Sequence, residues 1–423
     1  MNNDRIQLVP DLRFPEFVSD GDWEEKNLKD VATYENGKAH EQGIDENGKF
    51  VVVNSKFISS DATIRKFSNT ANCLAKSEET LMVLSDLPNG KALGKCFYVD
   101  KDDFYTVNQR ICKITPTKID SKILFYLLNR NPYFLSFDDG VKQTNLRNED
   151  VLNFELLLPS KLKEQQKIAS CLSSLDQLIT AQKEKLELLK NHKKGLMQNL
   201  FPQEGETVPK FRFPEFENDR DWEEKTIGDF IESHKGGASL TPSDFVTQST
   251  FEVIPKKAIT AGGWLKLDDL NPTFCSELFF SNNHQSVIDS SYLVTTLRDL
   301  VPSGPSIGYI VQYTGKKKMI LAQGVYGLKV KKEIVPEFLV QYSNTTHYRK
   351  LINAAMVGST QVHIRNGEFF KIPIKVSLVD EQRKITSCLC SLDDLISTQT
   401  AKIEKLQLHK KGLMQGLFPK IID

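Results

Sequence analysis

The chain has 423 residues, a length that predicts more than one domain. Lys and Arg together number 55, as do Asp and Glu, so the formal net charge is zero. This excludes the strongly basic composition of a small, non-specific nucleic-acid binder, although local DNA-binding patches remain compatible with it. No apolar run approaches the roughly 18 residues of a membrane span. There is no signal-peptide stretch and no Cys-x-x-Cys spacing among the 7 cysteines, so we expect a cytoplasmic protein without disulfides or a metal site.

The sequence contains two copies of a short segment. Residues 9–26 (VPDLRFPEFVSDGDWEEK) align without a gap to residues 208–225 (VPKFRFPEFENDRDWEEK), with 13 identities in 18 positions. We call these the frame segments. Each carries aromatic side chains, such as Trp23 and Trp222, that must be buried against the same body or against a partner.

A second pair of repeats predicts two long helices. Residues 164–202 match residues 381–419 with 26 identities in 39 positions. Apolar residues recur in steps of four and three, the pattern of a coiled coil, and Pro202 and Pro419 are expected to end the helices. At 1.5 Å per residue each helix would be about 58 Å long. The predicted seam consists of Ile168, Leu172, Leu175, Ile179, Gln182, Leu186, Leu189 and Leu196 in the first helix, and Ile385, Leu389, Leu392, Ile396, Gln399, Ile403, Leu406 and Leu413 in the second.

Two lysines on the seam favour an antiparallel pairing. In a parallel pair in register, Lys193 and Lys410 would face each other as partly desolvated like charges. In an antiparallel pair, each lysine faces the other helix near its start, around Leu389 or Leu172. Alternatively, each helix packs on its own body and the lysines extend to solvent.

The repeats divide the chain into a tandem array of the α+β class. We predict a first domain over 1–159 (body 27–159), a helix over 160–202, a second domain over 203–376 (body 226–376) and a helix over 377–423. The bodies have almost no similarity to each other, and we expect mixed α/β structure in each. Strands are expected at 50–54, 80–84, 96–99 and 110–114, and helices at 121–129 and 336–343. The frames and bodies would form two globular domains separated by the two antiparallel helices, with a pseudo-twofold relation.

No segment of the sequence has a convincing catalytic motif. Residues 43–49 approach a phosphate-binding loop, but Phe50 stands where the magnesium-binding Ser or Thr belongs, so a turn is expected. Residues 131–134 (NPYF) are similar to a methyltransferase tetrapeptide, yet no glycine-rich cofactor loop accompanies them.

A frame segment, a body and a long helix follow one another in this order twice along the chain. This arrangement resembles the DNA-specificity subunit of type I restriction-modification systems. The resemblance implies that each body is a target-recognition domain that reads one half of a bipartite site in double-stranded DNA. It also implies that the helices are antiparallel, set the spacer between half-sites and dock two methyltransferase subunits, which restriction subunits join. S-adenosylmethionine, ATP and magnesium would belong to those other subunits, and this chain would be non-catalytic.

Candidate DNA contacts follow from residue chemistry. Gln, Asn and Arg pair with base edges, and a recurrent Gly-x-x-Gln loop near the end of each body carries such side chains; a structural turn that enters the last segment of each body is the favoured interpretation of the same loop. Basic clusters are candidates for phosphate contacts, although each is also typical of a solvated loop. The base-reading candidates are Gln143, Asn145, Arg147, Gln361, His363 and Arg365; the basic clusters are Arg65, Lys66, Lys256, Lys257, Lys316, Lys317, Lys318, Lys329, Lys331 and Lys332.

Other functions are compatible with the same sequence. A tandem methyltransferase or nuclease would require the isolated chain to bind a cofactor or metal. A coiled-coil scaffold with two protein-binding heads would show no sequence-selective DNA binding. A specificity subunit of a different restriction architecture would share all of these features.

Overall fold

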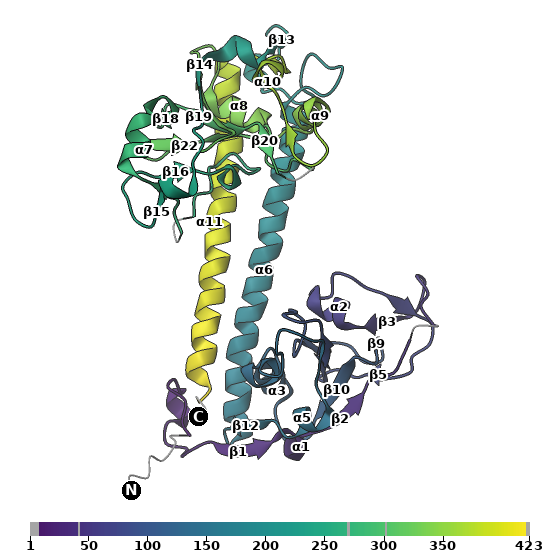
Figure 1. Cartoon of the computed structure of the whole chain (residues 1–423). Helices are drawn as coiled ribbons and strands as arrows, with labels where there is room; N and C mark the ends of the chain where they lie inside the picture. Colours follow the sequence, from purple (N-terminus) through teal and green to yellow (C-terminus); the bar gives the residue numbers. More distant parts are fainter. Residues whose placement is uncertain (1–7, 41–42, 269–270, 301–302, 420–423) are drawn as a thin grey trace. The chain divides into compact units, whose positions relative to one another are not determined.

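The computed structural model describes residues 8–40, 43–268, 271–300 and 303–419 (Figure 1). It divides into two compact units. Unit 1 comprises residues 1–183 and 402–423, and unit 2 comprises residues 184–401. Each unit therefore contains one body, one frame segment and part of each long helix.

Unit 1 is a mixed α/β domain, as the sequence predicted. In chain order its elements are η1 (Pro15–Phe17), β1 (Glu24–Asn27), α1 (Leu28–Val31), β2 (Ala32–Asn36), β3 (Phe50–Val53), α2 (Ser55–Ser59), β4 (Phe67–Ser68), β5 (Leu74–Ala75), β6 (Thr80–Val83), β7 (Ser85–Asp86), β8 (Cys96–Tyr98), β9 (Tyr105–Val107), β10 (Ile111–Pro116), α3 (Ser121–Leu128), α4 (Pro132–Leu135), β11 (Thr144–Asn145), α5 (Asn148–Leu152), β12 (Glu155–Leu158) and the first part of α6 (Leu162–Leu200). The strands expected near 50, 80, 96 and 110 and the helix expected at 121 are confirmed.

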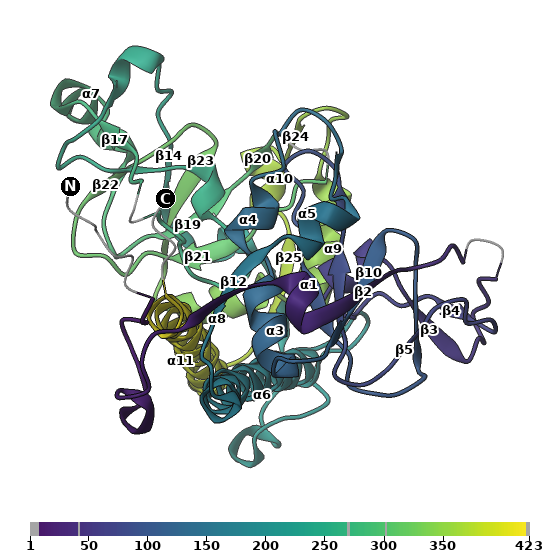
Figure 2. The same cartoon turned by 90° about the horizontal axis from the view of Figure 1, so that it is seen from below.

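Two four-stranded sheets and two short ladders organise unit 1. One sheet has the order β2-β10-β6-β8 and the other β4-β3-β9-β5. In the second sheet β3 and β9 are parallel, so their carboxyl ends meet at one edge. The ladder of β7 with β11 lies near the end of the body, and the ladder of β1 with β12 ties the frame to the last strand. α3 lies beside the first part of α6 (Figures 1 and 2), where the Tyr126 hydroxyl donates a 2.8 Å hydrogen bond to Asp176.

Unit 2 follows the element order of unit 1, with several additional short elements in its body. They are η2 (Pro214–Phe216), β13 (Glu223–Thr226), η3 (Ile227–Phe230), β14 (Ile231–Gly236), η4 (Pro242–Asp244), β15 (Phe245–Val246), β16 (Val253–Ile254), η5 (Lys256–Ala258), β17 (Phe274–Cys275), α7 (Glu277–Asn282), η6 (His284–Ser286), β18 (Val287–Ile288), β19 (Leu293–Thr296), β20 (Arg298–Asp299), β21 (Ile310–Gln312), β22 (Met319–Leu321), β23 (Val325–Val330), α8 (Pro336–Tyr342), α9 (Thr346–Ala355), β24 (Val362–His363), α10 (Asn366–Phe370), β25 (Pro373–Val376) and the first part of α11 (Val379–Leu417).

The two units share their strand pairing although their bodies share almost no sequence. The sheet β14-β23-β19-β21 corresponds to β2-β10-β6-β8, and the parallel pair β16 and β22 corresponds to β3 and β9. The ladder of β20 with β24 corresponds to that of β7 with β11, and β13 with β25 to β1 with β12. The predicted helix at 336–343 is α8, which follows β23 as α3 follows β10. The repeat therefore extends through the bodies as a common fold.

The long helices α6 and α11 each have 39 residues and end at Leu200 and Leu417, just before the two prolines. In unit 1, Ile168 of α6 shares a core with Leu417 of α11, and Asp176 of α6 pairs with Lys410 of α11. Later residues of α6 therefore contact earlier residues of α11. In unit 2, Lys193 pairs with Asp393. Within each unit the helices are therefore antiparallel, as predicted. All 16 residues of the predicted seam are buried or half-buried.

The two seam lysines are held by carboxylates and do not extend freely to solvent. In unit 2 the Lys193 ammonium donates to both oxygens of Asp393, at 2.6 and 2.8 Å, and Gln341 donates to the same carboxylate at 2.8 Å. In unit 1 the Lys410 ammonium donates to Asp176, which lies at the position equivalent to Asp393. The repeat thus conserves the ion pair and exchanges its third partner, Tyr126 for Gln341.

Each frame segment packs on the end of a long helix. Trp23 is 2% exposed and meets Phe418 of α11's end edge to face, with ring centroids 6.2 Å apart. Trp222 meets Phe201, at the end of α6, in the same way at 6.1 Å. Arginines of the frames also contact the helix starts, with Arg13 donating two hydrogen bonds to Glu164 and Arg212 two to Glu381. The two frame tryptophans are therefore buried inside their own unit.

Candidate nucleic-acid interface

In unit 1, the predicted Gly-x-x-Gln loop leads into the short ladder of β11 with β7. Gly140 has a φ of 70°, the left-handed region that glycine adopts without strain, so the loop does contain a turn. Beyond the turn, Gln143 and Asn145 are exposed. Asn145 lies opposite Ser85, and the Gln143 amide donates to the Ser85 hydroxyl at 2.8 Å. The loop therefore fixes the backbone and also presents amide side chains to solvent.

Unit 2 repeats this arrangement with different side chains. Gly358 has a φ of 116°, and a Cβ there would lie 2.1 Å from the Gln361 carbonyl oxygen. Gln361 is exposed and His363 half-buried, and His363 lies opposite Arg298 in the ladder of β24 with β20. The same backbone thus presents a Gln and an Asn in unit 1, and a Gln, a His and an Arg in unit 2.

Arg147 and Arg365 immediately precede the short helices α5 and α10. In both cases the arginine is the N-cap residue, with extended backbone, and its side chain is exposed. The Arg147 amide donates to Asp150 at 2.7 Å. Their backbones therefore begin the helices, while their side chains are exposed to solvent.

Beside the ladder of unit 1 lies a polar hollow of about 310 Å³, at the edge where β3 and β9 end. We call it the strand-edge hollow. Of the predicted residues it contains Lys66, and the structure adds residues that the sequence analysis did not select. Its described lining carries three cationic side chains, several amides and no carboxylate: Asn54, Ser55, Lys56, Lys66, Asn108, Gln109 and Arg110. Arg65 follows the preceding loop, where its guanidinium donates to the Ala62 carbonyl.

The corresponding edge of unit 2 carries Lys256 and Lys257, which follow β16 in η5. Lys256 lies beside Gly324, since a Cβ on that glycine would be 3.5 Å from the Lys256 Cδ. Lys257 faces a smaller cavity of about 30 Å³ together with Lys266 and Asp268. The structure thus brings Lys256 to the strand edge and places Lys257 beside it.

The other lysine clusters are weaker candidates because carboxylates already hold part of their charge. Lys317 pairs with Glu252 at 2.7 Å, and this hydrogen bond raises the pKa of the lysine. Lys329 lies 3.4 Å from Glu232, and Lys331 donates to a backbone carbonyl. Of the remaining members, Lys316, Lys318 and Lys332 are exposed.

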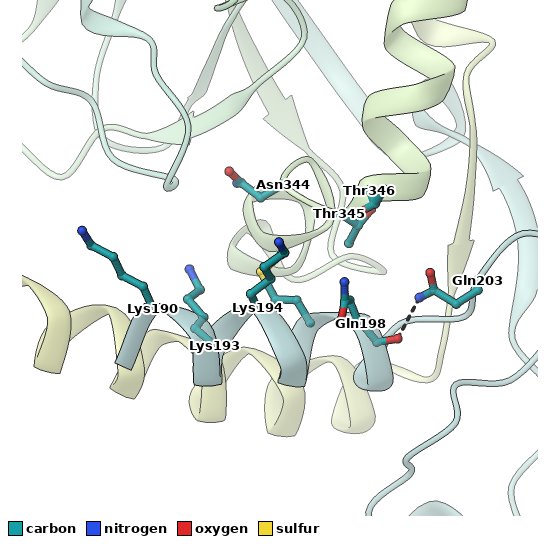
Figure 3. Close-up of a pocket in the computed structure, with 9 residues that line it drawn as sticks. Lys190, Lys193, Lys194, Gln198, Gln203, Asn344, Thr345 and Thr346 are labelled. Atoms are coloured by element: carbon teal, nitrogen blue, oxygen red, sulfur yellow. Dashed lines mark hydrogen bonds between the residues drawn. The ribbon is translucent and has the colours of Figure 1, made fainter. Parts of the chain in front are cut away.

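A further cavity in unit 2, of about 220 Å³, lies between the last part of α6 and the start of α9 (Figure 3). Lys190, Lys193 and Lys194 extend from α6 toward the turn that carries Asn344 and Thr345. Two of these lysines are already paired, Lys193 with Asp393 and Lys190 with Glu187. The cavity therefore carries less net positive charge than its three lysines suggest.

The described residues contain no grouping of three His, Cys, Asp or Glu side chains that could hold a metal ion. Burial raises the pKa of the Cys112 thiol to about 12, so this cysteine is a poor nucleophile at neutral pH. In the methyltransferase-like tetrapeptide, Asn131 caps α4 and Phe134 is fully buried, which are structural roles. Among the helices that the structure describes, none has the length and hydrophobicity needed to cross a bilayer.

Comparison with known families gives a direct assignment. The family described as "Type I restriction modification DNA specificity domain" matches the chain twice, over residues 20–191 and 219–408. The chain belongs to this family. Subunits of the family are generally non-catalytic and recognise DNA, and the two matches cover one body each.

Two archaeal relatives match almost the whole chain of this type I specificity subunit. The type I restriction enzyme MjaVIII specificity subunit of Methanocaldococcus jannaschii is 25% identical over 416 residues, covering 96% of this chain and 93% of the relative. The putative type I restriction enzyme MjaX specificity subunit of the same organism is 24% identical over 411 residues, covering 94% and 92%.

Solved structures support the fold. The S subunit of a type I restriction-modification system from M. genitalium superposes with a TM-score of 0.63 at 16% identity, covering 98% of this chain and all of the other. A chain from a study of complex assembly and conformational transition of the type I system gives a TM-score of 0.50 at 13% identity, covering 95% and 98%. At these identities the likeness concerns the fold.

Proposed function

We propose that this specificity subunit reads a bipartite site in double-stranded DNA, with each unit contacting one half-site. One observation carries the proposal. The two bodies share strand pairing down to the ladders β7–β11 and β20–β24, yet the exposed residues on those ladders differ. Two domains that recognise different DNA sequences can share one backbone fold, but they need different polar side chains on it. The reason is that base edges are distinguished by side-chain donors and acceptors.

The long helices would set the number of base pairs between the half-sites. Each is 39 residues long, which corresponds to about 58 Å at 1.5 Å per residue. B-DNA advances about 34 Å per turn, so a strut of this length is compatible with an unread spacer between the half-sites. Neither DNA-recognition domain needs a high affinity on its own. Once one domain is bound, the other meets its half-site at a high effective concentration.

We further propose that the chain docks two methyltransferase subunits, which restriction subunits join. Leu178 and Leu395 occupy equivalent positions in the repeated helices and are 42% and 53% exposed. An exposed leucine at the same position of both helices is compatible with two equivalent partner surfaces. S-adenosylmethionine, ATP and magnesium would be bound by these partners, and the complex would act on DNA in the cytoplasm.

The test exchanges one body. The chain, assembled with the methyltransferase of its own system, would methylate a library of duplexes, before and after residues 27–159 are replaced by the body of another family member. We expect one half-site to change while the other half-site and the spacer are kept. Changes in both half-sites would contradict independent reading.

Two other functions predict different results in the same assay. A scaffold with two protein-binding heads predicts no sequence selectivity from any assembled complex. An enzyme predicts that the isolated chain methylates or cuts DNA when S-adenosylmethionine or magnesium alone is supplied. The matched control is the partner methyltransferase without this chain, which should show no bipartite preference.

A further inference from the structure

Backbone hydrogen bonds align the two units residue by residue at the strand edge. In unit 1, the Leu84 amide donates to the Arg110 carbonyl at 3.0 Å. In unit 2, the Leu297 amide donates to the Gly324 carbonyl at 3.2 Å. Each of these leucines also accepts a hydrogen bond from the strand that follows the Gly-x-x-Gln loop, at 2.8 and 2.9 Å. Arg110 is therefore the structural equivalent of Gly324.

The same alignment pairs the residues that follow the two leucines, Ser85 in unit 1 and Arg298 in unit 2. Each unit consequently has one arginine at this edge, supplied from a different strand. The glycine of unit 2 accommodates the exchange, because it has a φ of 85° and a Cβ on it would lie 3.3 Å from the Arg298 Cβ. A glycine beside Arg298 thus replaces the arginine that unit 1 carries at Arg110.

Both arginines are exposed, and neither takes part in an ion pair among the residues that the structure describes. The nearest carboxylates along the ladders are held elsewhere. Asp86 accepts from the backbone amides of Leu87, Ala92 and Leu93, and Asp299 accepts from Ser306. An arginine free of internal carboxylates retains all of its donors for an external partner.

The neighbours of the arginines have the chemistry that reads base edges. Gln109 and Gln323 precede Arg110 and Gly324 in the chain, and both are exposed. Asn145 in unit 1 and His363 in unit 2 lie across the ladder from Ser85 and Arg298. Arginine pairs bidentately with guanine and Gln or Asn with adenine, so these side chains together suit the major groove better than phosphates alone.

We propose that Arg110 and Arg298 are the base-reading arginines of the two units and that each determines one base pair of its own half-site. This rests on the proposed function, because it presupposes that each unit reads a half-site. Arg110 directly precedes β10, whereas Arg298 lies in β20, so the two guanidinium groups start from different positions along the equivalent strand edges. The two half-sites would then differ in which base pair the arginine reads.

The test measures methylation by the complete complex on a library in which every position of the site is varied. Arg110→Ala is expected to reduce discrimination at one base pair of one half-site by roughly 5- to 150-fold, the range for loss of one bidentate contact, while the other half-site is unchanged. Arg298→Ala is expected to do the same in the other half-site. Arg383→Ala, at an exposed arginine of α11 paired with Asp380, is the matched control and should leave both half-sites intact.

Arginine-to-lysine variants separate base reading from phosphate contact. Lysine keeps the charge but lacks the planar, rigid fork of the guanidinium, so Arg110→Lys and Arg298→Lys should lose much of the discrimination that the alanine variants lose. If the alanine variants weaken methylation of all sequences equally and the lysine variants restore it, the arginines contact phosphate and the proposal is overturned. If the wild-type complex reads a bipartite site but neither arginine matters, this inference alone fails. If the wild-type complex reads no bipartite site, the proposed function fails.

Discussion

Replacing Lys193 by methionine should destabilise unit 2 far more than the equivalent change at Lys410 destabilises unit 1. The Lys193 and Asp393 side chains are only 11% and 9% exposed, so the substitution leaves a buried carboxylate with Gln341 as its remaining donor. Removing one partner of a buried ion pair costs about 3–5 kcal/mol. The Lys410 and Asp176 side chains are 22% and 38% exposed, and a pair that water reaches contributes about 0–1 kcal/mol.

Equilibrium urea unfolding combined with amide hydrogen exchange measures the two costs separately. Exchange in residues 184–200 reports on unit 2 and exchange in residues 162–183 on unit 1. A double variant, Lys193→Met with Asp393→Leu, should recover most of the lost stability, because it removes the orphaned charge together with its partner. Equal costs at Lys193 and Lys410, or a cost below about 1 kcal/mol at Lys193, would refute this reasoning.

Three further predictions concern the frame, the strand edge and the helices. Arg13→Ala should cost about 3–5 kcal/mol and loosen the start of α6 in hydrogen exchange, because Glu164, whose side chain is 1% exposed, loses a bidentate partner. Gly37→Ala should lower the thermal midpoint, since its Cβ would lie 2.1 Å from the Asn108 carbonyl oxygen, whereas Gly195→Ala, with nothing within 4 Å, should add about 0.5–1 kcal/mol. Insertion of about four residues at the midpoint of both α6 and α11 should lengthen the methylated spacer by about two base pairs; an unchanged spacer would contradict the ruler role.

Internal repetition made the frames and helices predictable from the sequence. Identical residues 217 positions apart established α6 and α11, and the two seam lysines correctly indicated their direction. The carboxylates that hold those lysines were not identified, because Asp176 and Asp393 lie off the heptad seam. Their positions become clear only when the tertiary packing of α3 and α8 on the helices is known.

The strand edge was only partly predictable. Lys66 and the Gly-x-x-Gln loops were selected, but Lys56 and Arg110 were not, although both follow buried β runs. Their proximity depends on the parallel pairing of β3 with β9, whose strands are more than 50 residues apart in the chain. A pairing of that separation leaves no periodic signal in the sequence. The exchange of Arg110 for Arg298 was equally hidden, because the bodies cannot be aligned without their backbone hydrogen bonds.

The most direct test of the central claim is adenine-methylation mapping of DNA from cells that carry this chain with its methyltransferase partner, compared with cells that lack the chain. The account predicts one new methylated motif with two defined half-sites and a spacer of fixed length. An assembled and active methyltransferase complex that yields no such motif would contradict it.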